Sequence, residues 1–269
     1  MGFALDFLLK LCPGGGFRVT DVPQSEGDAL IWLYKHTSGP NWTNHTNWLQ
    51  THTVGNWFGV TVAGGHVTQL SLGTNNLIGT IDATPLNGLP SLTVLHLGGN
   101  FPGLVADFSA WVLPATLTVV YFHNSFTIGG NASGWVLPAP LTLMYLYNTA
   151  VSGNVSSWVL PAPLQELYIY STGLSGTPDI SVNTAMRRYY YQDCALTQAN
   201  VNAILLSVYN RRMAFTFATP ALNVGGTNLA PSGVYGAACP PGTGKEYAFE
   251  LVNDSCGSGH IKWAVTFTP

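Results

Sequence analysis

Apolar residues recur with a spacing of two in six short segments, which begin at Leu70, Leu95, Val120, Met144, Leu167 and Tyr189. The segments share the skeleton L-x-L-x-x-N/T-x-L-x-G, at intervals of 25, 25, 24, 23 and 22 residues. In an extended strand, residues two apart face the same side, so the paired apolar residues face inward and their neighbours face out. One such unit cannot bury its own apolar side, whereas stacked units can. The pattern therefore predicts a solenoid in which each coil contributes one strand to a shared parallel sheet.

The rest of each coil follows the same period. A seventh copy is expected near Phe215, in "AFTFATPALNVGG". We expect the polar residue after the strand to hydrogen-bond backbone groups between coils, at Asn75, Asn100, Thr149 and Thr172. The repeated W-V-L-P-A lies on the return segment and predicts a packing column of Trp111, Trp135 and Trp158 rather than ligand contacts. Its prolines predict little helix in the middle coils.

These repeats resemble the leucine-rich repeat family over roughly residues 26–230. The stretches "NNLIGTI" and "TGLSGTP" are similar to the plant and bacterial subtype, in which an L-x-G-x-I/P stretch follows the strand and forms a second small strand. The resemblance implies a repeat solenoid of the α+β class, mostly β. It would be a right-handed superhelix whose parallel sheet lines the concave side.

The N-terminal end of the solenoid needs a cap, because its apolar core would otherwise open to water. Apolar residues at helical spacing between Ser25 and Gly39 predict a capping helix, with Ser25 as its N-cap. The W-x-G-V pattern of the cap in plant and bacterial leucine-rich repeat proteins is matched by Trp57, Gly59 and Val60. The cysteine pair that often flanks this pattern is absent, and Gly55 and Val62 stand near its places.

The C-terminal residues leave the repeat. "YAFELV" and "IKWAVTF" alternate like strands around the turn "NDSCGSGH", which predicts a β-hairpin cap. Cys239 and Cys256 are candidates for a disulfide, whereas Cys12 and Cys194 have no evident partners. The cysteine spacing matches no zinc pattern, and we expect no metal site.

The first residues form a separate apolar and Gly-rich segment. "MGFALDFLLKLCPGGG" lacks the basic region and cleavage site of a signal peptide, and its apolar run is too short to span a bilayer. We expect a short helix docked on the body or on a neighbouring subunit, with an interfacial anchor as the alternative. The predicted organisation is an N-terminal segment (1–24), an N-terminal cap (25–66), a solenoid of six or seven repeats (67–230) and a C-terminal cap (231–269).

Composition narrows the function classes. Only 8% of residues are charged, far below the usual quarter, and the net charge of -3 gives no basic footprint for nucleic acid. The aromatic and apolar content argues against disorder. An uncharged polar surface fits a displayed protein. In a chain this rich in Asn and Thr, chance explains most of the five N-x-S/T sequons, at Asn41, Asn44, Asn131, Asn154 and Asn253.

The outward positions of the predicted sheet are rich in tyrosine. One column holds His96, Tyr121, Tyr145, Tyr168 and Tyr190, the next holds His123, Tyr147 and Tyr170, and Glu166 and Arg188 lie at the edge. Adjacent strands lie about 4.8 Å apart, so these rings would form a continuous aromatic surface. Two interpretations stay open and can hold together. Either the rings stack and stabilise the sheet, or they form a flat platform that binds a sugar or a protein.

Two functions are compatible with these features. No nucleophile–base or paired-carboxylate motif accompanies the histidines, so we expect neither an enzyme nor a cofactor. The first hypothesis is a non-enzymatic recognition or adhesion protein. It would bind a protein or glycan on the aromatic face and be displayed on a cell, a virion or an extracellular assembly. The second is a structural subunit of a self-assembling surface, virion or filament, connected through residues 1–16.

Overall fold

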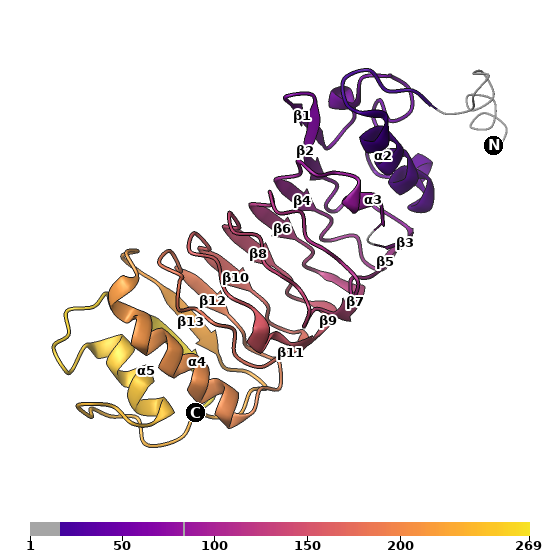
Figure 1. Cartoon of the computed structure of the whole chain (residues 1–269). Coiled ribbons are helices and arrows are strands. Elements are labelled where there is room, and N and C mark those ends of the chain that lie inside the picture. The colour runs from indigo at the N-terminus through magenta and orange to yellow at the C-terminus, as the bar shows by residue number, and fades with distance from the viewer. Residues whose placement is uncertain (1–16, 83) are drawn as a thin grey trace.

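The computed structural model describes residues 17–82 and 84–269. Its coils stack into an elongated body that is capped at both ends (Figure 1). The predicted helix or anchor at residues 1–16, and any assembly through it, lie outside the described residues. Within the described part of the chain, no helix is both long and apolar enough to cross a bilayer.

Two sheets run along the body, and each takes one strand from successive coils. The larger has the order β1 (Val60–Ala63), β2 (His66–Ser71), β4 (Val94–His96), β6 (Val119–Tyr121), β8 (Leu143–Tyr145), β10 (Glu166–Tyr168), β12 (Arg188–Tyr190), β13 (Ala221–Val224) and β14 (Ala264–Phe267). The smaller has the order β11 (Gly173–Ser175), β9 (Thr149–Asn154), β7 (Ser125–Asn131), β5 (Leu104–Asp107) and β3 (Gly79–Ile81).

Helices gather towards the two ends of the chain. The α-helices are α2 (Gln24–His36), α3 (Thr84–Asn87), α4 (Gln198–Arg211) and α5 (Gly244–Asn253). Short 3₁₀ turns are η1 (Gly39–Asn41), η2 (Val54–Asn56), η3 (Val155–Ser157) and η4 (Arg212–Ala214). Between α3 and α4, η3 is the one helical element among the described residues, as the prolines of the return segments predict.

The strands that carry the repeats pair in parallel and in register from β2 to β12. One inward-facing residue from each strand lies opposite the next, in the order Leu70, Leu95, Val120, Met144, Leu167 and Tyr189. Each of these side chains is at most 1% exposed. The core lies between the two sheets and the return segments, and the six predicted repeats and their shared parallel sheet are confirmed.

Where the chain turns after the strands, Asn75 and Asn100 bond backbone groups outside their own coil, as predicted. The hydroxyls of Thr149 and Thr172 instead donate to the carbonyls of Leu146 and Ile169 within their own coil. The amide of Asn100 donates to the carbonyls of Leu72 and Leu97, at 2.9 and 2.7 Å. Its Oδ1 accepts from the backbone N–H groups of Asn75 and Leu77. One side chain thus satisfies four backbone groups that would otherwise be buried without partners.

The tryptophans of the return segments form the predicted packing column. Trp111, Trp135 and Trp158 are all buried. The indole N–H groups of Trp135 and Trp158 donate to the carbonyls of Phe108 and Ala132 in the preceding coil, at 3.1 and 2.9 Å. These bonds attach Trp135 and Trp158 to the preceding coil, whereas Trp111 is held by packing in the core.

The end of the smaller sheet carries a second polar column, which we call the Asx–Ser ladder. Its members are Asp107/Ser109, Asn131/Ser133, Asn154/Ser156 and Asp179/Ser181, and in each pair the acid or amide oxygen accepts from the serine N–H. Between coils, the backbone N–H of Asn131 donates to Ser109 Oγ and that of Asn154 to Ser133 Oγ, both at 2.8 Å.

The Asx–Ser ladder gives two of the N-x-S sequons a structural origin. At Asn131 and Asn154 the side-chain oxygen closes the turn, and the serine accepts the next coil's N–H. The preceding residue must be glycine: Gly153 has φ +117°, and a Cβ there would overlap Asn131 Oδ1. The repeat itself therefore explains these two sequons.

The N-terminal cap is built around α2. The helix begins at Gln24 after Pro23, so the predicted Ser25 N-cap is wrong by two residues. The carboxylate of Glu26 is buried and accepts from Val67 N–H at 2.7 Å, which fixes α2 to β2. At the place of the absent cysteine pair, Asp21 accepts from the N–H groups of Val54 and Gly55.

The C-terminal cap differs from the predicted β-hairpin. The segment "YAFELV" lies in α5, because Gly244, Ala248 and Leu251 share the helical spacing that buries one side. The segment "IKWAVTF" does contain a strand, β14, but β14 pairs in parallel with β13 and not with a hairpin partner. Over so short a stretch, alternation and helical spacing select almost the same residues.

The seventh repeat is present but lies later than expected. Its strand is β13, whose Leu222 lies opposite Tyr189, while Phe215 packs against Trp263 with ring centroids 5.0 Å apart. Helix α4 is inserted between β12 and β13, which lengthens this coil beyond the period of the others. The sequence period locates coils of equal length and misses a coil that carries an inserted helix.

Candidate functional site

The candidate site is the outer face of the nine-stranded sheet, which we call the tyrosine face. Its first column runs from β4 to β12, where His96, Tyr121, Tyr145, Tyr168 and Tyr190 are direct register partners. Its second column, His123, Tyr147 and Tyr170, lies two residues further along each coil. All eight side chains are half-buried. The structure thus brings together the aromatic residues that the repeat pattern predicts.

The tyrosine rings stand on edge. Tyr145 and Tyr168 stack with centroids 4.4 Å apart and planes 6° apart, and Tyr168 stacks on Tyr190 at 4.8 Å and 9°. In the second column, Tyr147 and Tyr170 stack at 4.6 Å and 9°. Each stacked ring covers its neighbour's face, so ring edges and hydroxyls remain for solvent. The flat platform considered from the sequence is therefore replaced by rows of phenol edges.

Two glycines make room for the histidines. A Cβ on Gly73 would overlap the imidazole of His96, and one on Gly98 would lie 3.1 Å from Nδ1 of His123. The two imidazoles stack at 5.6 Å, and His123 stacks on Tyr147 at 4.9 Å. Burial lowers the pKa of both histidines, and for His123 the neighbouring His96 lowers it further.

A buried carboxylate lies beneath the tyrosine face. The hydroxyl of Tyr145 donates to Glu166 Oε2. Arg187 contacts Glu166 Oε1 through Nε at 2.8 Å and through Nη2 at 2.6 Å. Burial raises the pKa of Tyr145, and the bond to Glu166 raises it further. Burial and the charge of Glu166 also raise the pKa of Tyr168, to about 12.

Arg187 is the residue of this face that the repeat pattern does not reveal. The sequence places Glu166 and Arg188 at the edge of the face. The guanidinium of Arg188 donates to the carbonyls of Arg187 and Thr219, at 2.9 and 2.8 Å. Arg187 precedes the strand, so its position in the period gave no sign that its side chain reaches the preceding coil.

The carboxylate on the tyrosine face is paired, and three of the six tyrosine hydroxyls have no hydrogen-bond partner in the described part of the chain. Glu166 is neutralised by Arg187, and Tyr145 is bound to Glu166. The hydroxyls of Tyr121, Tyr170 and Tyr190 form no hydrogen bond with the described part of the chain. This arrangement suits a partner that packs against ring edges and exchanges hydrogen bonds with phenols.

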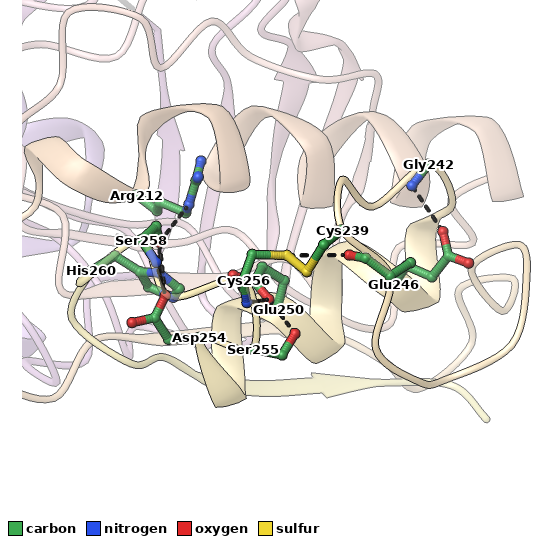
Figure 2. Close-up of a disulfide and its surroundings, with 11 residues drawn as sticks. Arg212, Cys239, Gly242, Glu246, Glu250, Asp254, Ser255, Cys256, Ser258 and His260 are labelled. Carbon is green, nitrogen blue, oxygen red and sulfur yellow. Dashed lines mark hydrogen bonds and ion pairs between the residues drawn. A yellow bond between two sulfur atoms is a disulfide. The ribbon is translucent and has the colours of Figure 1, made fainter.

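A separate polar cluster lies in the C-terminal cap (Figure 2). Among the described residues, Glu250, Asp254 and His260 form the group whose possible metal-ligand atoms lie within 4.8 Å of one another. Glu250 accepts from Ser255 Oγ and Cys256 N–H, and Asp254 accepts from Ser258. These bonds fix the loop that contains Cys256, which forms a disulfide with Cys239. The cluster therefore stabilises this part of the C-terminal cap.

No protein-family model and no curated protein matches the chain. Among solved structures, it is similar to the leucine-rich repeat ectodomain of the receptor kinase SOBIR1 from Arabidopsis thaliana, with 18% identity over 65% of this chain and 97% of that chain, and a TM-score of 0.46. It is also similar to Pollen Receptor Kinase 3, with 18% identity over 63% of this chain and 94% of that chain, and a TM-score of 0.42. A plant ice-binding protein is 12% identical over 66% of this chain and 81% of that chain, with a TM-score of 0.28.

The chain is a β-solenoid whose repeat architecture is similar to that of plant leucine-rich repeat ectodomains. The arguments about function that follow rest on its own side chains.

Proposed function

We propose that this protein is a non-enzymatic recognition protein that binds a protein ligand through the tyrosine face. One observation carries the proposal: the face is periodic, aromatic and exposed at its edges, and the hydroxyls of Tyr121, Tyr170 and Tyr190 have no hydrogen-bond partner among residues 17–82 and 84–269. An aromatic surface of this extent is typical of an interaction site. Tyrosine also supplies contact area at low cost in side-chain entropy.

The ring orientation favours a protein over a glycan. A sugar packs its apolar face onto an open aromatic face, but stacking covers the faces of Tyr145, Tyr168 and Tyr147. Protein surfaces instead offer carbonyl and amide groups that match phenol hydroxyls. A glycan remains the alternative for the outer rings of each column.

Display outside the cell is part of this proposal. The disulfide between Cys239 and Cys256 supports an oxidising compartment, where such bonds persist. The sparse charge of 8% supports a surface whose polarity comes from hydroxyl and amide groups. We therefore place the protein at a cell surface or in an extracellular setting.

The test is capture by the full chain from a displayed protein library and, in parallel, from a glycan array. The variant Tyr145→Ser/Tyr168→Ser removes two stacked rings from the centre of the face. The matched control is Phe126→Ser, an aromatic residue on the smaller sheet that is 55% exposed. We expect capture from the protein library to disappear with the double variant and to persist with the control. Capture that survives the double variant contradicts the proposal.

A further inference from the structure

The nine-stranded sheet ends in an open strand edge at β14. Among the strands of the described residues, β14 is hydrogen-bonded to β13 alone, and the N–H of Ala264 donates to Pro220 O at 2.9 Å on that side. Successive residues of a strand direct their backbone groups to opposite edges. The N–H and C=O groups of Val265 and Phe267 therefore point to the open edge. Such an edge is a template for a further strand.

The last coil of the core is incompletely covered at this edge. At the inward position of the other coils, from Leu70 to Leu222, side chains are at most 1% exposed. Val265 continues the same column, opposite Leu222, yet it is only half-buried. Solenoids normally cover their terminal coil. A strand added beside β14 would bury this remaining apolar surface.

A pocket of about 500 Å³ lies along this edge, lined by Tyr235, Lys245, Val265, Thr266, Phe267 and Pro269. Val265 and Phe267 project to one face of the sheet and Thr266 to the other. A pocket that touches all three follows the edge of the strand. The ring of Tyr235 packs on Phe249 and Phe267 at 5.0 and 5.7 Å and is still 46% exposed, so it offers an apolar wall.

Lys245 places a positively charged side chain in the lining of this pocket. Within the described part of the chain, its ammonium group forms no ion pair. The carboxylate of the next residue, Glu246, is bound to the N–H groups of Gly242 and Thr243, at 2.8 and 3.0 Å. Lys245 also lies in the first turn of α5, where the helix dipole disfavours a cation and favours an anion.

We propose that the open edge of β14 docks an extended peptide segment of another protein, with a carboxylate side chain opposite Lys245. The free backbone groups of Val265 and Phe267 would supply the main-chain bonds. Alternate side chains of the peptide would enter the pocket beside Tyr235, as in β-strand addition. This site is distinct from the tyrosine face, whose last strand is β12.

The test uses fluorescence anisotropy of the full chain with two labelled peptides, TVEVTV and TVKVTV, which differ only in the central charge. We expect the Glu peptide to bind about fivefold more tightly, as an exposed ion pair provides. Lys245→Glu should reverse the preference. Val265→Pro removes an outward N–H at an edge position that tolerates proline and should weaken both peptides by about tenfold.

Other outcomes overturn the proposal. If the two peptides bind equally and Lys245→Glu changes neither affinity, Lys245 does not recognise a carboxylate and the proposal is wrong. Loss of binding in Tyr145→Ser/Tyr168→Ser assigns the peptides to the tyrosine face. If light scattering shows that the chain alone forms dimers and that Val265→Pro dissolves them, a second copy occupies the edge. Failure of peptide binding at β14 leaves capture by the tyrosine face as a separate question.

Discussion

Two periodic columns run along the same coils and differ in how their polar atoms are used. In the Asx–Ser ladder, the side-chain oxygens of Asn131 and Asn154 accept a backbone N–H within the turn, and those of Ser133 and Ser156 accept one from the next coil. On the tyrosine face the rings stack on one another, and the hydroxyls of Tyr121, Tyr170 and Tyr190 have no hydrogen-bond partner in the described chain. A ladder of this kind stabilises the scaffold, and the oxygens that bond within it are engaged there. Unused donors on an exposed aromatic row are available for recognition.

The largest effect on stability is expected from a side chain placed in the space that the Asx–Ser ladder occupies. Gly153→Ala places a Cβ against Asn131 Oδ1 and Ser133 Oγ, at a φ of +117°. We expect the free energy of unfolding to fall by about 3 kcal/mol in urea denaturation, from strain and a broken turn. The matched control is Gly134→Ala, because a Cβ there meets nothing within 4 Å. Similar losses in both variants contradict the structural role of the ladder.

A smaller effect separates bound from unbound hydroxyls on the tyrosine face. Tyr145→Phe leaves Glu166 without one of its donors and should lower the free energy of unfolding by about 1.5 kcal/mol. Tyr121→Phe removes a hydroxyl with no partner in the described chain and should change it by less than about 0.5 kcal/mol. Denaturation of both variants checks the difference, and equal effects would refute it.

Behind the tyrosine face lie Tyr189 and Tyr191, where removal of a hydroxyl is expected to raise the free energy of unfolding. Both rings lie in the core, and their hydroxyls are buried without a hydrogen-bond partner in the part of the chain that the structure describes. Because an unsatisfied buried hydroxyl is costly, Tyr189→Phe should raise the free energy of unfolding by up to about 1 kcal/mol. A loss in thermal or chemical denaturation would show instead that this hydroxyl is bound.

The smallest effect is a dependence of stability on pH. Burial lowers the pKa of His96 and His123, so the folded protein binds fewer protons than the unfolded chain as pH falls below about 6.5. Stability should therefore decrease with acidification through this range. His96→Asn/His123→Asn should flatten that part of the profile, measured by denaturation at successive pH values. An unchanged slope in the double variant would assign the effect to other groups.

Periodicity made the repeats and the inward and outward positions predictable. A spacing of two fixes which side of a strand each residue faces, and equal coil lengths fix the register, so the members of the tyrosine columns follow from counting. Ring orientation does not follow, because it depends on stacking and on the space above Gly73 and Gly98. The sequence therefore suggested a flat platform where the structure has edges.

Features that break the period were not predictable. Arg187 reaches Glu166 from outside its strand, and α4 enlarges one coil. In α5, a few apolar residues satisfy strand alternation and helical spacing alike, and the packing of Ala248 and Leu251 into the core selects the helix. A contact that occurs in one coil only is not repeated along the sequence, so periodicity cannot predict it.

The most direct test compares the two columns in one binding experiment. A partner captured by the tyrosine face is titrated against Tyr145→Ser/Tyr168→Ser and against the ladder variant Ser133→Ala/Ser156→Ala, with folding checked for each. We predict that the tyrosine variant raises Kd by about a hundredfold, as loss of central aromatic contacts does. The ladder variant should stay within about twofold, because surface positions away from an interface contribute little. Equal losses of affinity in the two folded variants would contradict the account.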